Sequence, residues 1–356
     1  MGLRFGLVGS GLAGPLFSGA LATQPGGAEL VAVASRQEDR ARTFAEQHGI
    51  PRWFSRWQDL VSEPDINVVC IATPTGTHRD ITVAAAAAGK HVLTEKPMAT
   101  TLKDADAMIA ACATADVQLG VIFMYRFMDT AIKMKEAIDN GLIGRPIFGE
   151  CVGKFWRDQT YYDSADWRGT WAVEGGGSLM TQTSHTLDLM LWMLGPVAQV
   201  AGFFTVTSSH TIETEDLVVG SLRFASGALG SVVSSSAITP PVPRSLTIHG
   251  ERGTVRLTGD QLTQWDVSGE TDDDVRRMLQ ESEPDRGDTA AKAGYADSEL
   301  HRRQIEEFVA AVQENRPPAI DGKEGRRTLE VMRALYQSSV RNEIISLPIK
   351  EDRTAR

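Results

Sequence analysis

The sequence predicts an α/β protein with a parallel sheet in its first third and a second, α+β part built on a mostly antiparallel sheet. Two observations carry this prediction. Up to about residue 126, short β-branched runs alternate with helical patterns, which is typical of parallel strands joined by crossover helices. Beyond that point, most segments are alternating strands separated by turn residues, which favours antiparallel pairing.

In the first part, β-branched and apolar runs predict five strands, at Leu3–Val8, Leu30–Ala34, Asn67–Thr73, His91–Glu95 and Gln118–Phe123. A helix is expected over Glu38–His48, with Gly49 as a left-handed cap. Capping-box spacings predict two more helices, one from Ser55 and Gln58 through Glu63, the other from Thr101 and Asp104 over Leu102–Ala113.

In the second part, helices are expected near 129–140, 178–194, 299–314 and 323–340. Strands are expected at Gln199–Thr207, Leu217–Phe224, Ala228–Ser235, Ser245–Ile248 and Thr254–Leu257. The polar stretch Ser268–Asp297 is expected to be exposed. We therefore predict two domains, 1–126 and 127–356.

Composition excludes several classes of protein. With 42% apolar and 23% charged residues, the chain of 356 residues is an ordinary globular protein. Its net charge of -10 disfavours nucleic acid and anionic membranes as partners. Cys70, Cys112 and Cys151 are isolated in apolar runs, so neither a metal site nor a disulfide is expected and a reducing cytoplasm fits best. Neither a signal peptide nor a membrane-spanning segment is predicted.

A glycine-rich turn, Gly9-Ser10-Gly11-Leu12-Ala13-Gly14, follows the first predicted strand and opens a helix. Gly9 permits the tight turn, Gly11 lets a pyrophosphate approach the backbone, and Gly14 allows close packing of helix and strand. The pattern predicts a dinucleotide site, although glycines in such a turn also serve packing alone.

The second strand ends at Ser35-Arg36, where an NAD enzyme usually carries an acidic residue for the ribose 2′-hydroxyl. Ser35 and Arg36, with Arg40 one turn on, suit a 2′-phosphate, so NADP is slightly favoured over NAD. The alternative is a solvated Arg36 beside a site that accepts NAD.

Two further strands end in polar residues, at Ala72-Thr73-Pro74 and at Glu95-Lys96-Pro97. Ligands bind at the carboxyl ends of parallel strands, so Lys96 is expected to face the ligand beside the cofactor. His78 either caps the following helix or contacts the cofactor.

A glycine run at 175–177 precedes a helix on which His185, Asp188 and Trp192 share one face. Asp188 could raise the basicity of the His185 imidazole, which makes His185 a candidate acid–base residue; a buried structural histidine is the alternative. Upstream lie aromatic and arginine residues that suit either a sugar ring or a packed interface: Trp156, Arg157, Tyr161, Tyr162, Trp167 and Arg168.

Several motifs together make the chain resemble the family of glucose–fructose oxidoreductase, inositol dehydrogenase and the MocA proteins. They are GLVGSGLAG, CIATPTGTH, TEKPMATT, MYRF at 124–127, DWRGTWAVEGGGSLMTQTSHTLDL at 166–189 and QIEEFVAAVQENRPPAIDGKEG at 304–325. The resemblance implies a doubly wound Rossmann domain, then a domain with a large open sheet whose outer face commonly pairs subunits, and so a homo-oligomer such as a dimer or tetramer.

The resemblance also implies that Lys96 and His185 flank the reacting carbon. Many members place an Asp one turn before this His, where this chain has Thr181. Any carboxylate role would then pass to Asp188. The expected cofactor contacts are Gly9, Ser10, Gly11, Leu12, Ala13, Ser35, Arg36, Ala72, Thr73, Pro74, His78, Glu95, Lys96 and Arg126.

The activity expected is reversible oxidation of a secondary hydroxyl of a sugar, glycoside or cyclitol with NADP or NAD. His185 would move the hydroxyl proton, and Lys96 would stabilise the developing oxyanion. Two alternatives remain, an NAD-dependent glycosidase that works by oxidation and elimination and a sugar-sensing regulator without turnover.

Overall fold

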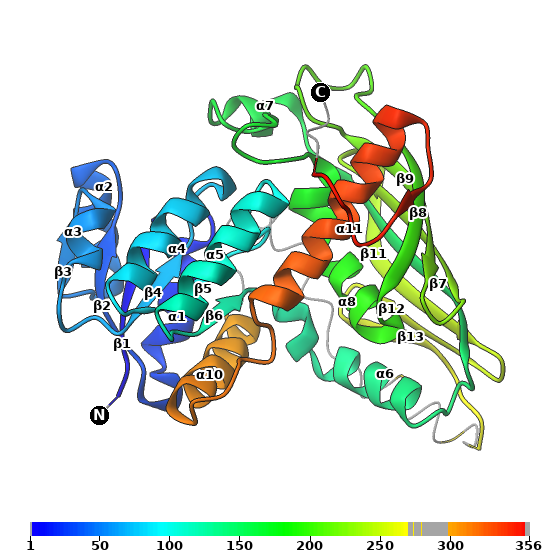
Figure 1. The fold of residues 1–356 in the computed structure, drawn as a ribbon, viewed down its shortest axis with the longest axis horizontal. Helices are drawn as coiled ribbons and strands as arrows, with labels where there is room; N and C mark the ends of the chain where they lie inside the picture. Colours follow the sequence, from blue (N-terminus) through cyan, green and yellow to red (C-terminus); the bar gives the residue numbers. More distant parts are fainter. Residues whose placement is uncertain (1, 270–272, 274–278, 280–297, 353–356) are drawn as a thin grey trace. The chain divides into compact units, whose positions relative to one another are not determined.

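The computed structural model describes residues 2–269, 273, 279 and 298–352. Its chain divides into two compact units (Figure 1). The first is formed by Met1–Met124 with Thr289–Arg327, and the second by Tyr125–Asp288 with Thr328–Arg356. The predicted domains 1–126 and 127–356 remain a prediction about separately folding parts.

The first unit contains a six-stranded, fully parallel sheet in the order β3-β2-β1-β4-β5-β6. Its strands are β1 (Arg4–Val8), β2 (Glu29–Ala34), β3 (Arg52–Phe54), β4 (Val68–Ile71), β5 (His91–Thr94) and β6 (Leu119–Val121). The strand order reverses between β1 and β4. Doubly wound sheets bind nucleotides at such a switch point, at the carboxyl ends of the strands. The predicted doubly wound sheet is confirmed.

Local sequence signals mark the ends of two helices of this unit. The helices of the unit are α1 (Gly14–Ala22), α2 (Glu38–His48), α3 (Trp57–Val61), α4 (His78–Ala87), α5 (Leu102–Thr114) and α10 (Glu299–Gln313), with single 3₁₀ turns η1 (Pro25–Gly27) and η2 (Thr75–Thr77). Gly49 closes α2 at φ 65°, as predicted. Thr101 caps α5 by accepting a hydrogen bond from the Asp104 backbone, also as predicted.

The predicted capping box at Ser55 is wrong. Arg56 is the N-cap of α3, and no side chain caps this helix. Because the helix begins one residue later than the box requires and ends at Val61, Ser55 lies outside its first turn.

The second unit contains an eight-stranded sheet in the order β13-β12-β11-β7-β10-β9-β8-β14. Its strands are β7 (Pro146–Trp156), β8 (Val197–Thr205), β9 (Leu217–Phe224), β10 (Leu229–Ser235), β11 (Ala237–Gly250), β12 (Thr254–Thr258), β13 (Gln261–Asp266) and β14 (Ile345–Ser346). Only the β7–β10 pair is parallel. The predicted mostly antiparallel sheet is confirmed.

The remaining helical elements are η3 (Met124–Phe127), α6 (Asp129–Asp139), α7 (Gln159–Asp163), the π-helical turn η4 (Leu179–Thr183), α8 (Ser184–Leu194) and α11 (Gly322–Arg341). In Figure 1, α8 lies against the sheet of its unit. Glycines on β7 permit this packing. A Cβ at Gly149 would lie 2.7 Å from Leu194, and one at Gly153 would lie 2.4 Å from the Thr183 hydroxyl.

The helix expected over 178–194 is a π-turn followed by an α-helix. Strands β3, β7, β13 and β14 were not predicted. The expectation for Ser268–Asp297 concerns residues that lie almost wholly outside the described part of the chain. Among the described helices, none has the length and apolar character needed to cross a membrane.

Candidate functional site

In the first unit, the turn between β1 and α1 has the geometry of a phosphate cradle. Gly9 has φ +113°, and a Cβ there would lie 2.3 Å from the Ala72 carbonyl oxygen. A Cβ on Gly11 would meet no atom within 4 Å, so the backbone there is open to a ligand. No side chain caps the N-terminus of α1, and its first turn carries no acidic residue. This arrangement fits the pyrophosphate of a dinucleotide.

The end of β2 lies beside this turn. The Ser10 hydroxyl donates a hydrogen bond to the Ser35 Oγ over 2.9 Å. Arg36 and Arg40 are exposed. A hydroxyl and a guanidinium suit a 2′-phosphate or adenosine, and the choice between NAD and NADP stays a prediction.

His78, the first residue of α4, is buried at 1% exposure. Its Nε2 lies 2.8 Å from the Thr73 carbonyl oxygen and its Nδ1 lies 3.1 Å from that of Pro97. Burial lowers the pKa of His78, which favours the neutral ring. The neutral ring has one N–H and donates to one of these two carbonyl oxygens, and it packs between the segments that follow β4 and β5, next to Lys96.

Glu95 supports the same segment from another direction. Its Oε2 accepts a hydrogen bond from the Lys96 backbone N–H over 3.1 Å, and its Oε1 lies 3.1 Å from Nε2 of His301. His301 is on α10 and is 1% exposed. Gln304, one turn further, donates to the Val121 carbonyl over 2.7 Å. The ends of β5 and β6 are thus fixed by a helix some 200 residues later in the sequence.

Sequence reasoning missed His301 and Gln304. A signal was available, because two polar side chains spaced three apart occupy the buried face of an amphipathic helix.

In the second unit, Glu215 holds the start of the π-turn η4. Its carboxylate accepts hydrogen bonds from the backbone N–H groups of Gly177 and Leu179, the latter over 2.9 Å, and from the Tyr336 hydroxyl over 3.1 Å. Complete burial raises the pKa of Glu215 to about 7, although these donors offset part of the effect. A π-turn often marks a functional position, and this one leads directly into the helix with His185.

Thr181 and Gln182 lie within that turn. The Thr181 hydroxyl donates to the Gly177 carbonyl over 2.8 Å, and Gln182 Oε1 accepts from the Arg157 guanidinium over 2.7 Å. His185 follows on α8 at 7% exposure. Catalysis by His185, with Thr181 in support, stays a prediction.

Asp188 forms a buried ion pair with Arg126. Two guanidinium nitrogens of Arg126 donate to the two carboxylate oxygens over 2.6 and 2.7 Å, and Thr328 donates to the same carboxylate over 2.9 Å. The guanidinium also lies 5.6 Å from the centre of the Trp192 ring. This contact was not foreseen. Both roles proposed from the sequence, Arg126 at the cofactor and Asp188 beside His185, stay predictions.

The aromatic and arginine residues form a packed group in the second unit. The Arg168 guanidinium lies 4.3 Å from the centre of the Tyr161 ring and 4.7 Å from that of Trp167. Tyr162 is buried, and its hydroxyl bonds to Ser236 over 2.7 Å. Tyr161 and Trp167 are half-buried, and their binding of a sugar, like that of Tyr162, stays a prediction.

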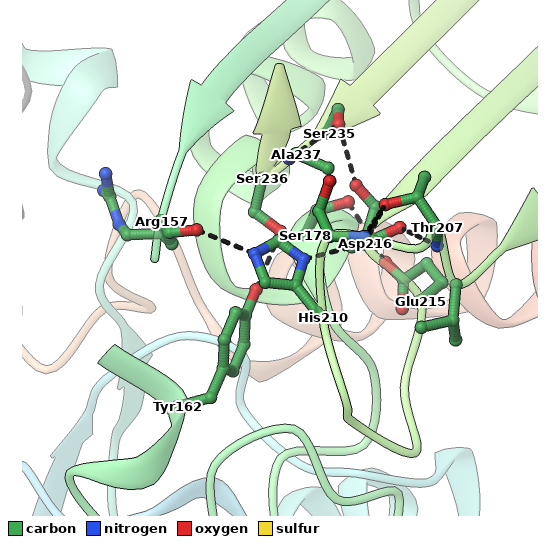
Figure 2. A network of polar contacts seen from close by, with 12 residues as sticks. Arg157, Tyr162, Ser178, Thr207, His210, Glu215, Asp216, Ser235, Ser236 and Ala237 are labelled. Atoms are coloured by element: carbon green, nitrogen blue, oxygen red, sulfur yellow. Dashed lines mark hydrogen bonds and ion pairs between the residues drawn. The ribbon is translucent and has the colours of Figure 1, made fainter. Parts of the chain in front are cut away.

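Figure 2 shows the polar network that supports this group. His210 lies at its centre, with Nδ1 2.7 Å from the Asp216 carboxylate and Nε2 2.7 Å from the Arg157 carbonyl oxygen. Thr207 donates to Asp216 through both its backbone N–H and its hydroxyl. The network fixes the end of β7 without any exposed polar group, which sequence patterns do not indicate.

Within the described ranges, no group of three or more His, Cys, Asp or Glu side chains could hold a metal ion.

Two family models match the chain. One, described as an oxidoreductase family with an NAD-binding Rossmann fold, matches residues 3–123. The other, a GFO/IDH/MocA C-terminal domain, matches residues 131–256. The first match covers the parallel sheet, and the second covers the eight-stranded sheet from β7 into β12, without β13 and β14.

Curated relatives and solved structures agree with these matches. The chain is 28% identical to myo-inositol 2-dehydrogenase of Thermotoga maritima, over 92% of this chain and 93% of that protein. It is 32% identical to 1,5-anhydro-D-fructose reductase of Ensifer adhaerens, over 71% and 74%. The WlbA dehydrogenase of Bordetella pertussis, solved with NADH and UDP-GlcNAcA, superposes with a TM-score of 0.88 at 33% identity, over 98% of this chain and 99% of that chain.

The glycine-rich turn, the reversed strand order beside it, the second sheet and these matches lead to one assignment. The chain belongs to the GFO/IDH/MocA family of oxidoreductases with an NAD-binding Rossmann fold.

Proposed function

We propose that the protein reversibly oxidises a secondary hydroxyl group of a sugar, glycoside or cyclitol, with NADP or NAD as the hydride acceptor. The observation that carries the proposal is the position of Lys96. It follows β5, at the same sheet edge as the open glycine-rich turn, where doubly wound sheets bind a nucleotide and its substrate. Relatives named inositol dehydrogenase and anhydrofructose reductase support the substrate class.

The residues divide the chemistry between them. When bound, the nicotinamide supplies a hydride acceptor or donor. His185 removes the hydroxyl proton during oxidation and returns it during reduction. The Lys96 ammonium stabilises the negative charge that develops on the same oxygen. Thr181 can hold a hydrogen bond but cannot stabilise an imidazolium as a carboxylate would.

For the cofactor, we propose a modest preference for NADP. Ser35 and Arg36 directly follow β2, at the position where an acidic residue would repel a 2′-phosphate. The contacts proposed for the dinucleotide are those set out from the sequence. Among them, Gly9 makes the tight turn and Gly11 leaves the backbone open to a ligand, next to the uncapped N-terminus of α1.

For the substrate, we propose that Tyr161, Trp167 and Arg168 cover the apolar face of a sugar ring and bind its hydroxyls. Arg157 and Tyr162, which both contact the Tyr161 ring, are proposed to bind the substrate with them. A free sugar, glycoside or cyclitol is the first candidate. A nucleotide sugar is the second, because the WlbA dehydrogenase to which the chain is similar was solved with UDP-GlcNAcA.

We further propose that copies of the chain pair through the outer face of the eight-stranded sheet, as a dimer or tetramer. Phe203, Val219, Val233 and Val152 are successive cross-strand neighbours in one row across that sheet. Phe203 and Val219 are 69% and 49% exposed, which is unusual for large apolar side chains in neighbouring strands.

The test is the absorbance of reduced nicotinamide, followed with NAD and NADP against myo-inositol, free sugars, aryl glycosides and UDP-sugars. Steady reduction of cofactor by a sugar or cyclitol supports the proposal. Cleavage of a glycoside without net reduction indicates the glycosidase. Tight binding of cofactor and sugar without any turnover indicates the regulator.

A further inference from the structure

Two consecutive residues of η3 contact the face of α8 that carries His185. The ring of Tyr125 lies 4.6 Å from that of His185, centroid to centroid, with the planes tilted by 39°. Arg126, the next residue, pairs with Asp188 one turn along the same helix. Tyr125 and His185 are 9% and 7% exposed, so this contact is made away from solvent.

The Tyr125 ring is itself held by a buried charged pair. The guanidinium of Arg244, on β11, lies over the ring at 4.1 Å from its centre. Arg244 donates to the Asp260 carboxylate and lies 3.8 Å from the sulfur of Met128. Arg244 is 7% exposed and Asp260 is 3% exposed. The contacts thus run in sequence from Asp260 to Arg244, to Tyr125 and to His185, all within the second unit.

We propose that Tyr125, fixed by Arg244 and Asp260, is the positioning residue that sets the ring orientation of His185. The inference rests on the proposed function, in which His185 moves the substrate proton. General acid–base catalysis requires the imidazole nitrogen within hydrogen-bond reach of the reacting hydroxyl. An imidazole can rotate about two side-chain bonds, and an aromatic neighbour in offset contact restricts that rotation.

The ion pair between Arg244 and Asp260 fixes the position of the Tyr125 ring. A guanidinium stacks on an aromatic face more favourably when the pair is desolvated, as here. Asp260 keeps the buried guanidinium compensated, so the stack does not leave an unpaired charge. The Tyr125 ring is therefore held by the Arg244 guanidinium as well as by apolar packing. Because the ring cannot turn, it restricts the orientations open to the His185 ring packed against it.

The test compares ring-retaining and ring-removing variants. Tyr125→Phe keeps the aromatic contact, so we expect kcat within about twofold of the unaltered enzyme. Tyr125→Leu removes it and should lower kcat by about 10- to 100-fold with a small change in KM, because misplacing a reacting group by about 1 Å costs that much. Kinetics use the panel compound that the unaltered enzyme oxidises fastest.

A second variant avoids removing the Tyr125 side chain. Arg244→Lys keeps the charge opposite Asp260 but removes the planar group that stacks on Tyr125, so kcat should fall by about 3- to 10-fold. Arg256→Met is the matched control, since this arginine lies on the adjacent strand β12 with 43% of its side chain exposed. It should leave kcat unchanged.

A spectroscopic measurement separates this inference from the proposed function. The chain has seven histidines, so selective ¹³C labelling of their rings resolves His185, which is identified by its loss in His185→Gln. We expect the His185 ring resonances, measured on the full chain without ligand, to move in Tyr125→Leu and Arg244→Lys and to stay in place in Tyr125→Phe. Unmoved resonances and normal kcat in both Tyr125→Leu and Arg244→Lys, with His185→Gln inactive, would overturn the inference alone. An active His185→Gln would instead contradict the proposed function.

Discussion

Lys96 and His185 are the side chains on which the proposed chemistry depends. Lys96→Ala and His185→Ala should each lower kcat by roughly 10²–10⁴-fold, because both act on the substrate oxygen in the transition state. The Kd for reduced cofactor, measured by fluorescence titration, should change little. Lys103→Ala, at an exposed position on α5, and His249→Ala, on β11, are the controls.

Near-normal turnover in both variants would show that neither residue takes part in the reaction. Loss of cofactor binding in Lys96→Ala would instead mean that this lysine serves the dinucleotide and not the substrate oxygen.

At the residue scale, the proposed preference for NADP depends on Arg36. Arg36→Asp should weaken NADP binding far more than NAD binding, because it removes a partner of the 2′-phosphate and adds a like charge. Arg42→Asp, on the exposed side of α2, is the control. If the unaltered protein binds both cofactors equally and Arg36→Asp changes neither Kd, Arg36 is a solvated surface residue and NAD is the cofactor.

At the scale of elements, Glu215 links pH to the stability of the π-turn. Its pKa is about 7 in the folded protein and near 4.5 when unfolded, so the folded state holds a proton that the unfolded state releases. The contribution of Glu215 protonation to the free energy of unfolding is therefore complete below pH 4.5 and is lost as the pH rises through 7. The difference of about 2.5 pH units corresponds to at most about 3 kcal/mol.

Urea unfolding at pH 5 and pH 8 measures this effect. Between pH 5 and pH 8, the free energy of unfolding should fall by about 2–3 kcal/mol more in the unaltered protein than in Glu215→Gln, because the Gln side chain cannot titrate. Glu213→Gln, two residues earlier and exposed, should behave like the unaltered protein. An identical pH dependence in Glu215→Gln and the unaltered protein would place the Glu215 pKa at its ordinary value.

Local signals predicted some elements correctly, although the one at Ser55 was wrong, and elements shaped by packing were not predicted. The Gly49 cap of α2 and the Thr101 cap of α5 depend on one or two neighbouring residues, and both were found. Strand β7 was missed because its glycines, which α8 requires at close range, lower its strand signal. The π-turn was missed because helical periodicity does not distinguish one extra residue in a turn.

Some residues of the candidate site were also predictable from the sequence, and others were not. Lys96 and the glycine-rich turn follow strands in the sequence, and a simple topological rule assigns them to one sheet edge. Tyr125, Glu215, Arg244 and His301 were not found, because each acts through a partner that is between 36 and 206 residues away or on another element. Their contribution depends on tertiary packing, which no local pattern encodes.

For the whole molecule, the apolar row Phe203, Val219, Val233 and Val152 on the eight-stranded sheet predicts that copies of the chain form a dimer or tetramer. Val219→Glu puts a charge at the centre of that row and should convert the proposed dimer or tetramer to smaller species in light-scattering measurements. Val340→Glu is a matched control, because Val340 is 50% exposed but lies on α11. A monomeric unaltered protein, or an assembly that survives Val219→Glu, would rule out this face as the interface.

The central claim is that this chain transfers a hydride between a nicotinamide cofactor and a sugar or cyclitol hydroxyl. Its most direct measurement is the absorbance of reduced nicotinamide, followed with the purified protein, NAD or NADP, and the panel of cyclitols, sugars, glycosides and UDP-sugars. The account predicts sustained reduction with at least one sugar, glycoside or cyclitol, and its loss in His185→Ala. Absence of reduction with every panel member, although the protein binds the dinucleotide, would contradict it.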